Sequence, residues 1–206
     1  IASVNFYPVI VKPYIGGGGS NFTFLAQDQQ ESEFFCHYLM KYNISPMVQE
    51  YVGSPDHEYT IGVLSDQRGN IISTVGIRRY IQSGLSNRLK ISSQFEKNKM
   101  LVVSSGISQG EIIFDRKILN EANRIAKAID SKGPLNIQGR YVNGKFYTFE
   151  INPRFSGTTF QRALAGINEP DLCIRKYVLG EPVPKILSPR SGKILRGLFE
   201  KFIPDP

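Results

Sequence analysis

Four polar side chains near residue 150 are of the types that hold a metal ion beside phosphate groups. Glu150 and Asn152 alternate on one short segment, and Gln138 lies on the segment before it. A carboxylate and two amide oxygens are hard ligands that suit Mg²⁺ when substrate phosphates supply further oxygens. Arg154 follows and adds a fixed positive charge. The residue types therefore predict a magnesium site next to a phosphorylated ligand.

A β-hairpin is predicted to carry these side chains. Apolar and polar residues alternate on both sides of Asn143-Gly144, as in half-buried strands. A two-residue turn there would place Glu150 opposite Ile137, whereas a three-residue loop keeps the polar positions on one face. We therefore expect the three-residue loop, with Gly144 at positive φ and with Gln138 and Glu150 on the same face. Alternation alone also fits a surface hairpin with solvated polar side chains.

The order of the residue types adds a family resemblance. Gln138, followed by Glu150-Ile-Asn152-Pro-Arg154, resembles the metal-binding end of the ATP-grasp superfamily, and in particular the synthetase domain of the carbamoyl phosphate synthetase large subunit. The resemblance implies an α+β ATP-grasp fold, represented by its C-terminal ATP-binding portion, with the nucleotide between two β-sheet-containing subdomains. It implies ATP and Mg²⁺ or Mn²⁺ as cofactors, the metal held by Gln138, Glu150 and Asn152. Arg154 would act in catalysis by stabilising the transferring group.

A glycine run near the N-terminus, residues 16–19, lies between two strand-like segments. With Ser20 it also looks like a flexible linker, and that interpretation stays open. In the ATP-grasp superfamily such a loop closes over the phosphates, through backbone N–H groups, after a strand with a basic residue. The resemblance assigns these contacts to Lys12, Gly17, Gly18, Gly19 and Ser20.

The next strand is expected to lead into the nucleoside-binding hinge. The resemblance places adenine against Glu50 and the backbone around Tyr51 and Val52, and it places the ribose hydroxyls on Glu58. Read without the resemblance, this segment is equally an ordinary polar strand end. Ser108, in a loop of small residues, is the corresponding candidate for a polar contact with the nucleotide.

Periodicity and capping residues predict the elements around the site. Asp28 and Glu31 resemble a capping box before a helix whose buried stripe would be Phe34, Phe35, Tyr38, Leu39 and Tyr42. We expect helices over 28–42, 115–130, 160–165 and 170–178, and strands over 8–13, 22–25, 47–52, 58–64, 71–81 and 100–103.

The chain is expected to form one ATP-grasp domain fragment over 1–206. Its parts would be a glycine-flap subdomain, about 8–55, a metal-binding subdomain, about 56–186, and a tail, 187–206. The family has an N-terminal domain before this region, so its absence from the sequence predicts a piece of a longer enzyme.

Composition sets outer bounds on function. The net charge of +7 and pI of about 9.4 fit a polyphosphate ligand or nucleic acid, but no nucleic-acid-binding motif accompanies them. The basic stretch of Arg78, Arg79, Arg88 and Lys90 is interpreted as a solvated face, with substrate contact as the alternative. Two cysteines without metal-ligand spacing predict free thiols in the cytoplasm, and no apolar run is long enough to predict a membrane span.

The resemblance implies a ligase that activates a carboxylate, or bicarbonate, with ATP. An acyl phosphate would form and an amine or ammonia would attack it. Two alternatives stay open: an ATP-binding module without a complete catalytic site, and a basic nucleic-acid-binding domain. A homodimer is also left open.

Overall fold

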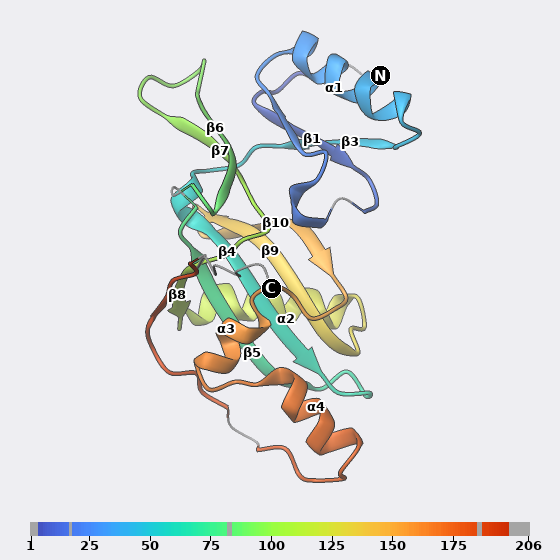
Figure 1. Cartoon of the computed structure of the whole chain (residues 1–206), viewed down its shortest axis with the longest axis vertical. Coiled ribbons are helices and arrows are strands. Elements are labelled where there is room, and N and C mark those ends of the chain that lie inside the picture. The colour runs from blue at the N-terminus through green and yellow to red at the C-terminus, as the bar shows by residue number, and fades with distance from the viewer. Residues whose placement is uncertain (1–3, 17, 82–83, 185–186, 198–206) are drawn as a thin grey trace, which may run out of the picture.

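The computed structural model describes residues 4–16, 18–81, 84–184 and 187–197. Figure 1 shows a small sheet above a larger one. The strands are β1 (Val9–Pro13), β2 (Phe24–Ala26), β3 (Pro46–Glu50), β4 (Glu58–Ser65), β5 (Ile71–Arg79), β6 (Asn87–Ser92), β7 (Met100–Ser104), β8 (Gly110–Ile113), β9 (Gly133–Val142), β10 (Lys145–Asn152) and β11 (Lys193–Ile194). The helices are α1 (Gln29–Lys41), α2 (Arg116–Ala128), α3 (Thr159–Leu164) and α4 (Glu169–Tyr177), with short 3-10 helices η1 (Gly18–Ser20) and η2 (Pro55–His57).

The small sheet has the strand order β2-β1-β3 and is antiparallel. Helix α1 covers one face, where Cys36 and Leu39 pack on Val9 and Val11. The other face packs against the two-stranded sheet β6-β7 through a second apolar cluster. The hairpin β6-β7 falls within the expected 56–186 subdomain, yet it packs on the N-terminal sheet.

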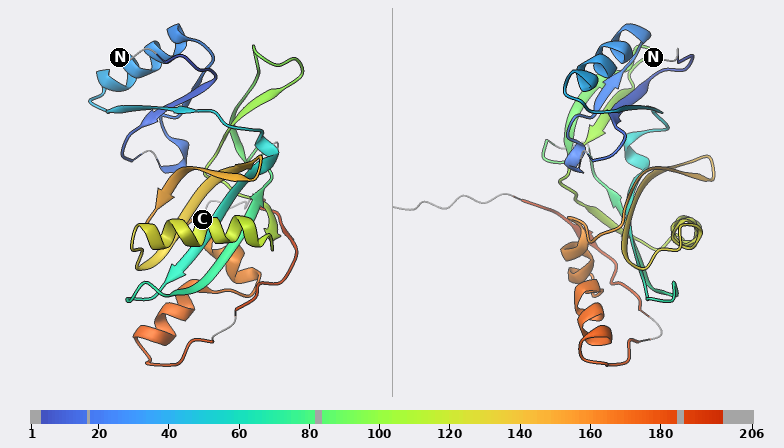
Figure 2. Two further views of the ribbon diagram at one scale, coloured as in Figure 1. Left: turned by 180° about the vertical axis from the view of Figure 1, so that it is seen from behind. Right: turned by 90° about the vertical axis from the view of Figure 1, so that its right-hand side faces the viewer.

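The large sheet has the order β10-β9-β4-β5-β8-β11, and helices cover both of its faces. Figure 2 shows α2 on one side of the sheet and α3 and α4 on the other. Alternate residues of β4, such as Ile61 and Val63, face α2, while Leu64 packs toward α4 with Ile77 of β5. The remaining part of this second face carries polar side chains and forms one wall of the candidate site. The expected tail contributes β11 to this sheet.

Helix starts follow the predicted capping. The Asp28 side chain accepts a 2.8 Å hydrogen bond from the Glu31 amide, and Gln27 N–H donates to Glu31 Oε2 at 2.6 Å. This arrangement resembles a capping box, except that Glu31 accepts from the residue before the N-cap and not from Asp28 itself. Asp115 accepts from Lys117 N–H at 2.8 Å and caps α2 in the same way. The predicted helices and strands therefore begin within a few residues of the observed ones, whereas β6, β8 and β11 were not predicted.

The predicted buried stripe of α1 is correct only in part. Leu39 is buried and Phe35 packs against the same cluster, as predicted, but Phe34, Tyr38 and Tyr42 are 63%, 37% and 53% exposed, and the buried Cys36 was not predicted. The small Cys36 lets the helix approach the sheet, and the aromatic rings instead contact one another along the outer surface. Aromatic type alone therefore did not identify the packed face.

The turn between β9 and β10 differs from the predicted three-residue loop. Val142 pairs with Lys145, so the loop has two residues, and Asn143 and Gly144 both have positive φ, 49° and 80°. These values match a type I′ turn. A two-residue turn alone would put Glu150 on the wrong face.

A β-bulge restores the predicted face. Thr148 pairs with Gly139, but Glu150 pairs with Gln138, so Phe149 is an extra residue on β10. The bulge changes which face the following residues point to, and Glu150 leaves the side that carries Ile137. The prediction that Gln138 and Glu150 share a face is therefore confirmed, for a reason that the sequence analysis did not include.

None of the described helices is long and apolar enough to cross a membrane. Cys36 and Cys173 are free thiols, as predicted.

Candidate functional site

A cavity of about 920 Å³ lies between the small and the large sheet. Lys12 of β1 and Glu50 of β3 border it on one side, and residues 146–152 of β10 border it on the other. Cavities of several hundred Å³ that join two structural units are typical small-molecule sites. The position between the sheets agrees with the expected place for a nucleotide.

Lys12 reaches across this cavity from the small sheet to the large one. Its Nζ donates a 2.6 Å hydrogen bond to the backbone oxygen of Phe149, the bulged residue. Burial lowers the pKa of Lys12 from its ordinary value of 10.5, and the nearby Glu150 carboxylate partly opposes this change. A desolvated ammonium with few partners is well placed to bind an anion.

The proposed metal ligands come together at the edge of the cavity. Glu150 and Asn152 both line it, and Asn152 Nδ2 donates to Glu150 Oε1 at 2.8 Å. Gln138 is the cross-strand partner of Glu150. Within the described residues, no three His, Cys, Asp or Glu side chains gather into a metal cage. The donor set is thus one carboxylate and two amides, which fits Mg²⁺ only if phosphate oxygens complete its coordination.

A second cavity of about 130 Å³ adjoins the first, and Ser20 and Glu150 line both. Hydroxyl and amide groups dominate its wall, with the exposed Arg154 as its cation. Ser108, expected at the nucleotide, borders this smaller cavity. The further wall residues are Gly19, Thr60, Ser105, Gly106, Asn136, Gln138, Ser156, Gly157 and Thr158.

The glycine flap rests on the loop that follows β7. Ser20 Oγ donates a 2.6 Å hydrogen bond to the backbone oxygen of Ser104. A Cβ added to Gly106 would lie 3.0 Å from the Gly19 Cα, so the two backbones are close. Gly18 and Gly19 are exposed in η1, while Gly17 lies outside the described residues.

The expected hinge lies where β3 leaves the small sheet. Glu50, Tyr51 and Val52 all line the large cavity. Tyr51 N–H donates to the Pro8 oxygen at 3.1 Å, and its ring lies under the Arg140 guanidinium, 4.3 Å from Cζ to the ring centroid. Val52 O accepts from Arg140 Nη1 at 3.1 Å. These contacts hold the hinge backbone in an extended form beside the cavity.

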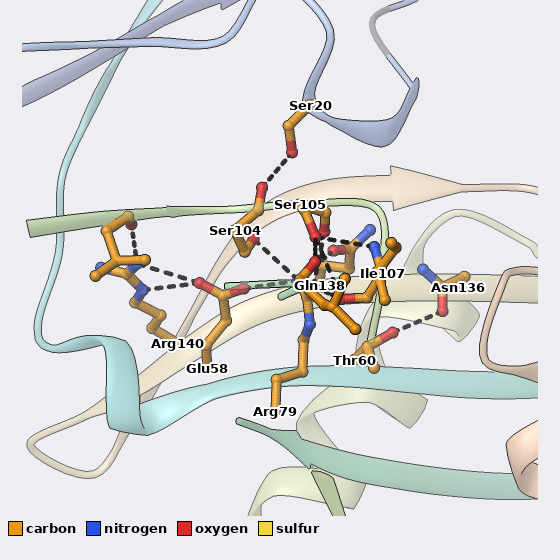
Figure 3. A network of polar contacts seen from close by, with 12 residues as sticks. Ser20, Glu58, Thr60, Arg79, Ser104, Ser105, Ile107, Asn136, Gln138 and Arg140 are labelled. Carbon is orange, nitrogen blue, oxygen red and sulfur yellow. Dashed lines mark hydrogen bonds and ion pairs between the residues drawn. The ribbon is translucent and has the colours of Figure 1, made fainter. Parts of the chain in front are cut away.

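Glu58 has contacts that differ from the expected ribose role. Glu58 borders the cavity but is only 1% exposed, and two arginines occupy its carboxylate. Oε1 accepts from Arg79 at 2.8 Å, and Oε2 accepts from Arg140 at 3.1 and 3.2 Å (Figure 3). A ribose hydroxyl would compete with two buried charge-assisted pairs. Glu58 therefore holds the two arginines in this structure, and its contact with ribose stays a prediction.

Sequence reasoning missed Arg79 and Arg140 as parts of the site. Arg140 occupies the same alternating set as Gln138, which was a usable signal. In β5, Val75, Ile77 and Arg79 also alternate and all three are buried. The favoured interpretation of the basic stretch as a solvated face holds for Arg78, which pairs with Glu111 at the surface, but it is wrong for Arg79.

The chain is similar to several known proteins. The model of a family described as "ATP-grasp in the biosynthetic pathway with Ter operon" matches residues 45–196. The arginine-specific large chain of carbamoyl phosphate synthase from Halalkalibacterium halodurans is 27% identical over 164 residues, which are 74% of this chain and 13% of that protein. Pyruvate carboxylase from Bacillus subtilis is 24% identical over 73% of this chain and 12% of its own length.

Solved structures show the same fold. N5-carboxyaminoimidazole ribonucleotide synthetase from Thermus thermophilus superposes with a TM-score of 0.57 at 16% identity, covering 90% of this chain and 45% of that one. A biotin carboxylase complex from Campylobacter jejuni gives a TM-score of 0.52 at 17% identity, covering 82% of this chain and 36% of that one. The chain therefore spans less than half of the length of these relatives.

Proposed function

Because the chain belongs to the ATP-grasp family, we propose that it binds ATP with Mg²⁺ and activates a carboxylate or bicarbonate as an acyl phosphate. An amine or ammonia then attacks the acyl phosphate and releases phosphate. The observation that supports this most is the convergence of Lys12, Glu150 and Asn152 on the cavity between the sheets. Relatives named as carbamoyl phosphate synthase and pyruvate carboxylase support the same reaction class.

The phosphates of ATP occupy the space between Lys12 and the metal face. The Lys12 ammonium offsets their negative charge, and backbone N–H groups of the flap close over them from the side of Ser20. Glu150, Asn152 and Gln138 would hold Mg²⁺, since a carboxylate and two amide oxygens suit this ion when phosphates supply further oxygens. When bound, Mg²⁺ neutralises charge that develops on the phosphates.

The nucleoside lies at the hinge. Glu50 and the backbone of Tyr51 and Val52 contact adenine, because an extended strand end offers a donor and an acceptor at fixed spacing. The smaller cavity receives the carboxylate at Arg154, which stabilises the transferring phosphoryl group. Glu150 borders both cavities, so it marks the place where phosphate and carboxylate meet.

Calorimetric titration of ATP with and without Mg²⁺ tests the proposal. We expect binding that Mg²⁺ strengthens, and a stabilisation of the native protein of about 2.7 kcal/mol at a hundredfold excess of MgATP over Kd. Glu150→Gln should abolish the Mg²⁺ effect while leaving the melting temperature without ligand nearly unchanged. Glu96→Gln is the matched control, since Glu96 is exposed, its carboxylate pairs with the neighbouring Lys99, and neither residue lines the cavity.

Two results would contradict the proposal. Equal MgATP affinity in Glu150→Gln and the parent would remove Glu150 from the metal site. An absence of any thermal shift at millimolar MgATP would remove ATP as the ligand. Formation of ADP that depends on an added carboxylate and amine separates a ligase from a module that only binds ATP.

A further inference from the structure

Two neighbouring arginines of β5 have opposite environments. Arg78 is 40% exposed at its side chain and pairs with Glu111 at 2.7 Å. Arg79 is 1% exposed at its side chain and points into the polar network of Figure 3. A buried arginine loses its hydration, so the groups that replace water around it determine what it does.

Arg79 binds three backbone or side-chain oxygens of the loop after β7. Its Nη1 donates to Ser104 Oγ at 2.9 Å, and its Nη2 donates to the backbone oxygens of Ser105 at 2.8 Å and Ile107 at 3.3 Å. The backbone oxygen of the same Ser104 accepts from Ser20 of the flap. One guanidinium thus fixes the surface on which the flap rests.

The same guanidinium approaches the proposed metal face. Nη1 lies 3.5 Å from Gln138 Oε1, at the outer limit of a hydrogen bond, and because its two hydrogens already serve Glu58 and Ser104, this third contact is a shared one. Because arginine has donors and no acceptor, only the oxygen of the Gln138 amide can face it favourably. A carbonyl oxygen has two acceptor positions, so it can accept from Arg79 and still ligate a metal. The contact therefore favours the amide oxygen over the amide nitrogen on the side of Gln138 that faces Arg79.

Glu58 offsets part of the positive charge at this place. Its Oε1 accepts from the same Nη1 at 2.8 Å, and the pair is almost fully buried. Because Oε2 of the same carboxylate pairs with Arg140, Glu58 and the two arginines together keep one net positive charge. Glu58 therefore reduces, but does not remove, the repulsion between Arg79 and a divalent cation bound at Gln138.

We propose that Arg79 is a positioning residue of the ATP site. It orients the Gln138 amide oxygen toward the metal and holds the 104–107 loop beneath the flap. This inference rests on the proposed function, in which Gln138 ligates Mg²⁺. Arg79 acts through Gln138 and Ser104 and does not touch the substrate itself.

The experiment measures ATP affinity with Mg²⁺ and with a chelator, and takes the ratio of the two dissociation constants. Arg79→Lys keeps the charge but cannot bind Glu58, Ser104 and Ser105 at once, and we expect the Mg²⁺ enhancement to fall about tenfold or more, as for other groups that orient metal ligands. Gln138→Ala should lower the ratio similarly, and the double variant should lower it no further. Arg78→Lys is the matched control and should leave the ratio unchanged.

The outcomes separate this inference from the proposed function. A parent protein that shows no Mg²⁺ enhancement overturns both. A parent with the enhancement and an Arg79→Lys variant that retains it overturn the positioning role alone. Equal loss of affinity with and without Mg²⁺ overturns the orienting of Gln138, because it indicates that Arg79 acts only through the 104–107 loop.

If Arg79→Lys does not fold, a second measurement tests the inference on the parent protein. In nuclear magnetic resonance spectra, a guanidinium held at both Nη atoms shows separate, slowly exchanging Nη–H signals. We expect these signals for Arg79, and we expect them to shift together with the Gln138 side-chain amide when MgATP is added. A freely rotating guanidinium, or one unaffected by MgATP, overturns the inference.

Discussion

At the scale of a single residue, the charge of Lys12 bears most directly on the binding of the proposed ligand. Burial between the two sheets disfavours its ammonium form and lowers its pKa, and Glu150 only partly compensates. In the window between this lowered pKa and the ordinary value of 10.5, the unfolded chain binds more protons than the folded one. Stability contributed by this residue therefore rises with pH across that window.

ATP binding should reverse this effect and take up a proton. The negative phosphates raise the pKa of Lys12 again, so at a pH between the lowered pKa and 10.5 part of the Lys12 population becomes protonated on binding. Calorimetry in two buffers of different ionisation enthalpy measures this uptake. Lys12→Met should remove it and weaken ATP binding with or without Mg²⁺, while Lys41→Met, an exposed change on α1, should keep it. Equal uptake in Lys12→Met and the parent would contradict the assignment.

The types and the order of the residues were enough to predict part of the candidate site from the sequence. Gln138, Glu150 and Asn152 do share a face, and Lys12 does lie across the cavity from them. The partners of Glu58 could not be predicted, because Arg79 and Arg140 come from strands that only the folded sheet brings together. Long-range pairing of this kind leaves no local signal in the chain.

The β9-β10 hairpin shows why a correct face followed from an incorrect turn. Asn143-Gly144 is the strongest short signal for a two-residue turn, and the structure has that turn. The prediction set it aside because uniform pairing would have mixed apolar and acidic positions. A β-bulge in the middle of β10 keeps the apolar and acidic positions on separate faces instead. No residue type in the sequence indicates a bulge at that place.

The contact between β4 and α3 gives an element-level prediction. A Cβ added to Gly62 would lie 2.4 Å from Arg162 Cζ, and Arg162 forms a buried pair with Glu169 at 2.7 Å. Gly62→Ala must displace this guanidinium from its partner, so we expect a loss of about 2 kcal/mol or more of unfolding free energy. Urea denaturation measures it.

Gly84→Ala provides the comparison for that change. Nothing lies within 4 Å of a Cβ at Gly84, and its φ is not in the left-handed region. The unfolding free energy of Gly84→Ala should stay within roughly 0.5 kcal/mol of that of the parent. Equal stability of the two variants would mean that Arg162 moves aside without cost.

At the scale of the whole molecule, a nucleotide would join two sheets that each have their own core. The small sheet packs on α1 and β6-β7, and the large sheet packs on α2, α3 and α4 (Figures 1 and 2). The Lys12 side chain already bridges to the large sheet through its hydrogen bond to Phe149 of β10. Periodicity predicted the separate elements because each buries its own apolar face. The packing of β6-β7 on the N-terminal sheet could not be read from periodicity.

MgATP should therefore slow hydrogen exchange on both sides of the cavity at once. We expect protection in the loop between β1 and β2 and in β10, because the ligand contacts both and suppresses local opening. Helix α4, at the far end of the large sheet, serves as the internal control and should not change. Protection confined to one sheet would contradict a ligand held between them.

The extra residue Phe149 divides the hairpin into two segments, and the register of strand pairing differs between them. From the tip to Thr148 the pairing is counted from the turn, and from Glu150 onward it is aligned with Gln138. One residue added to each strand at the tip would lengthen the segment between the turn and Thr148. The pairing of Glu150 with Gln138 would stay the same. The tip at Asn143-Gly144, which is exposed, is thus a place where a reporter peptide or a fluorescent label can be attached without disturbing the polar face.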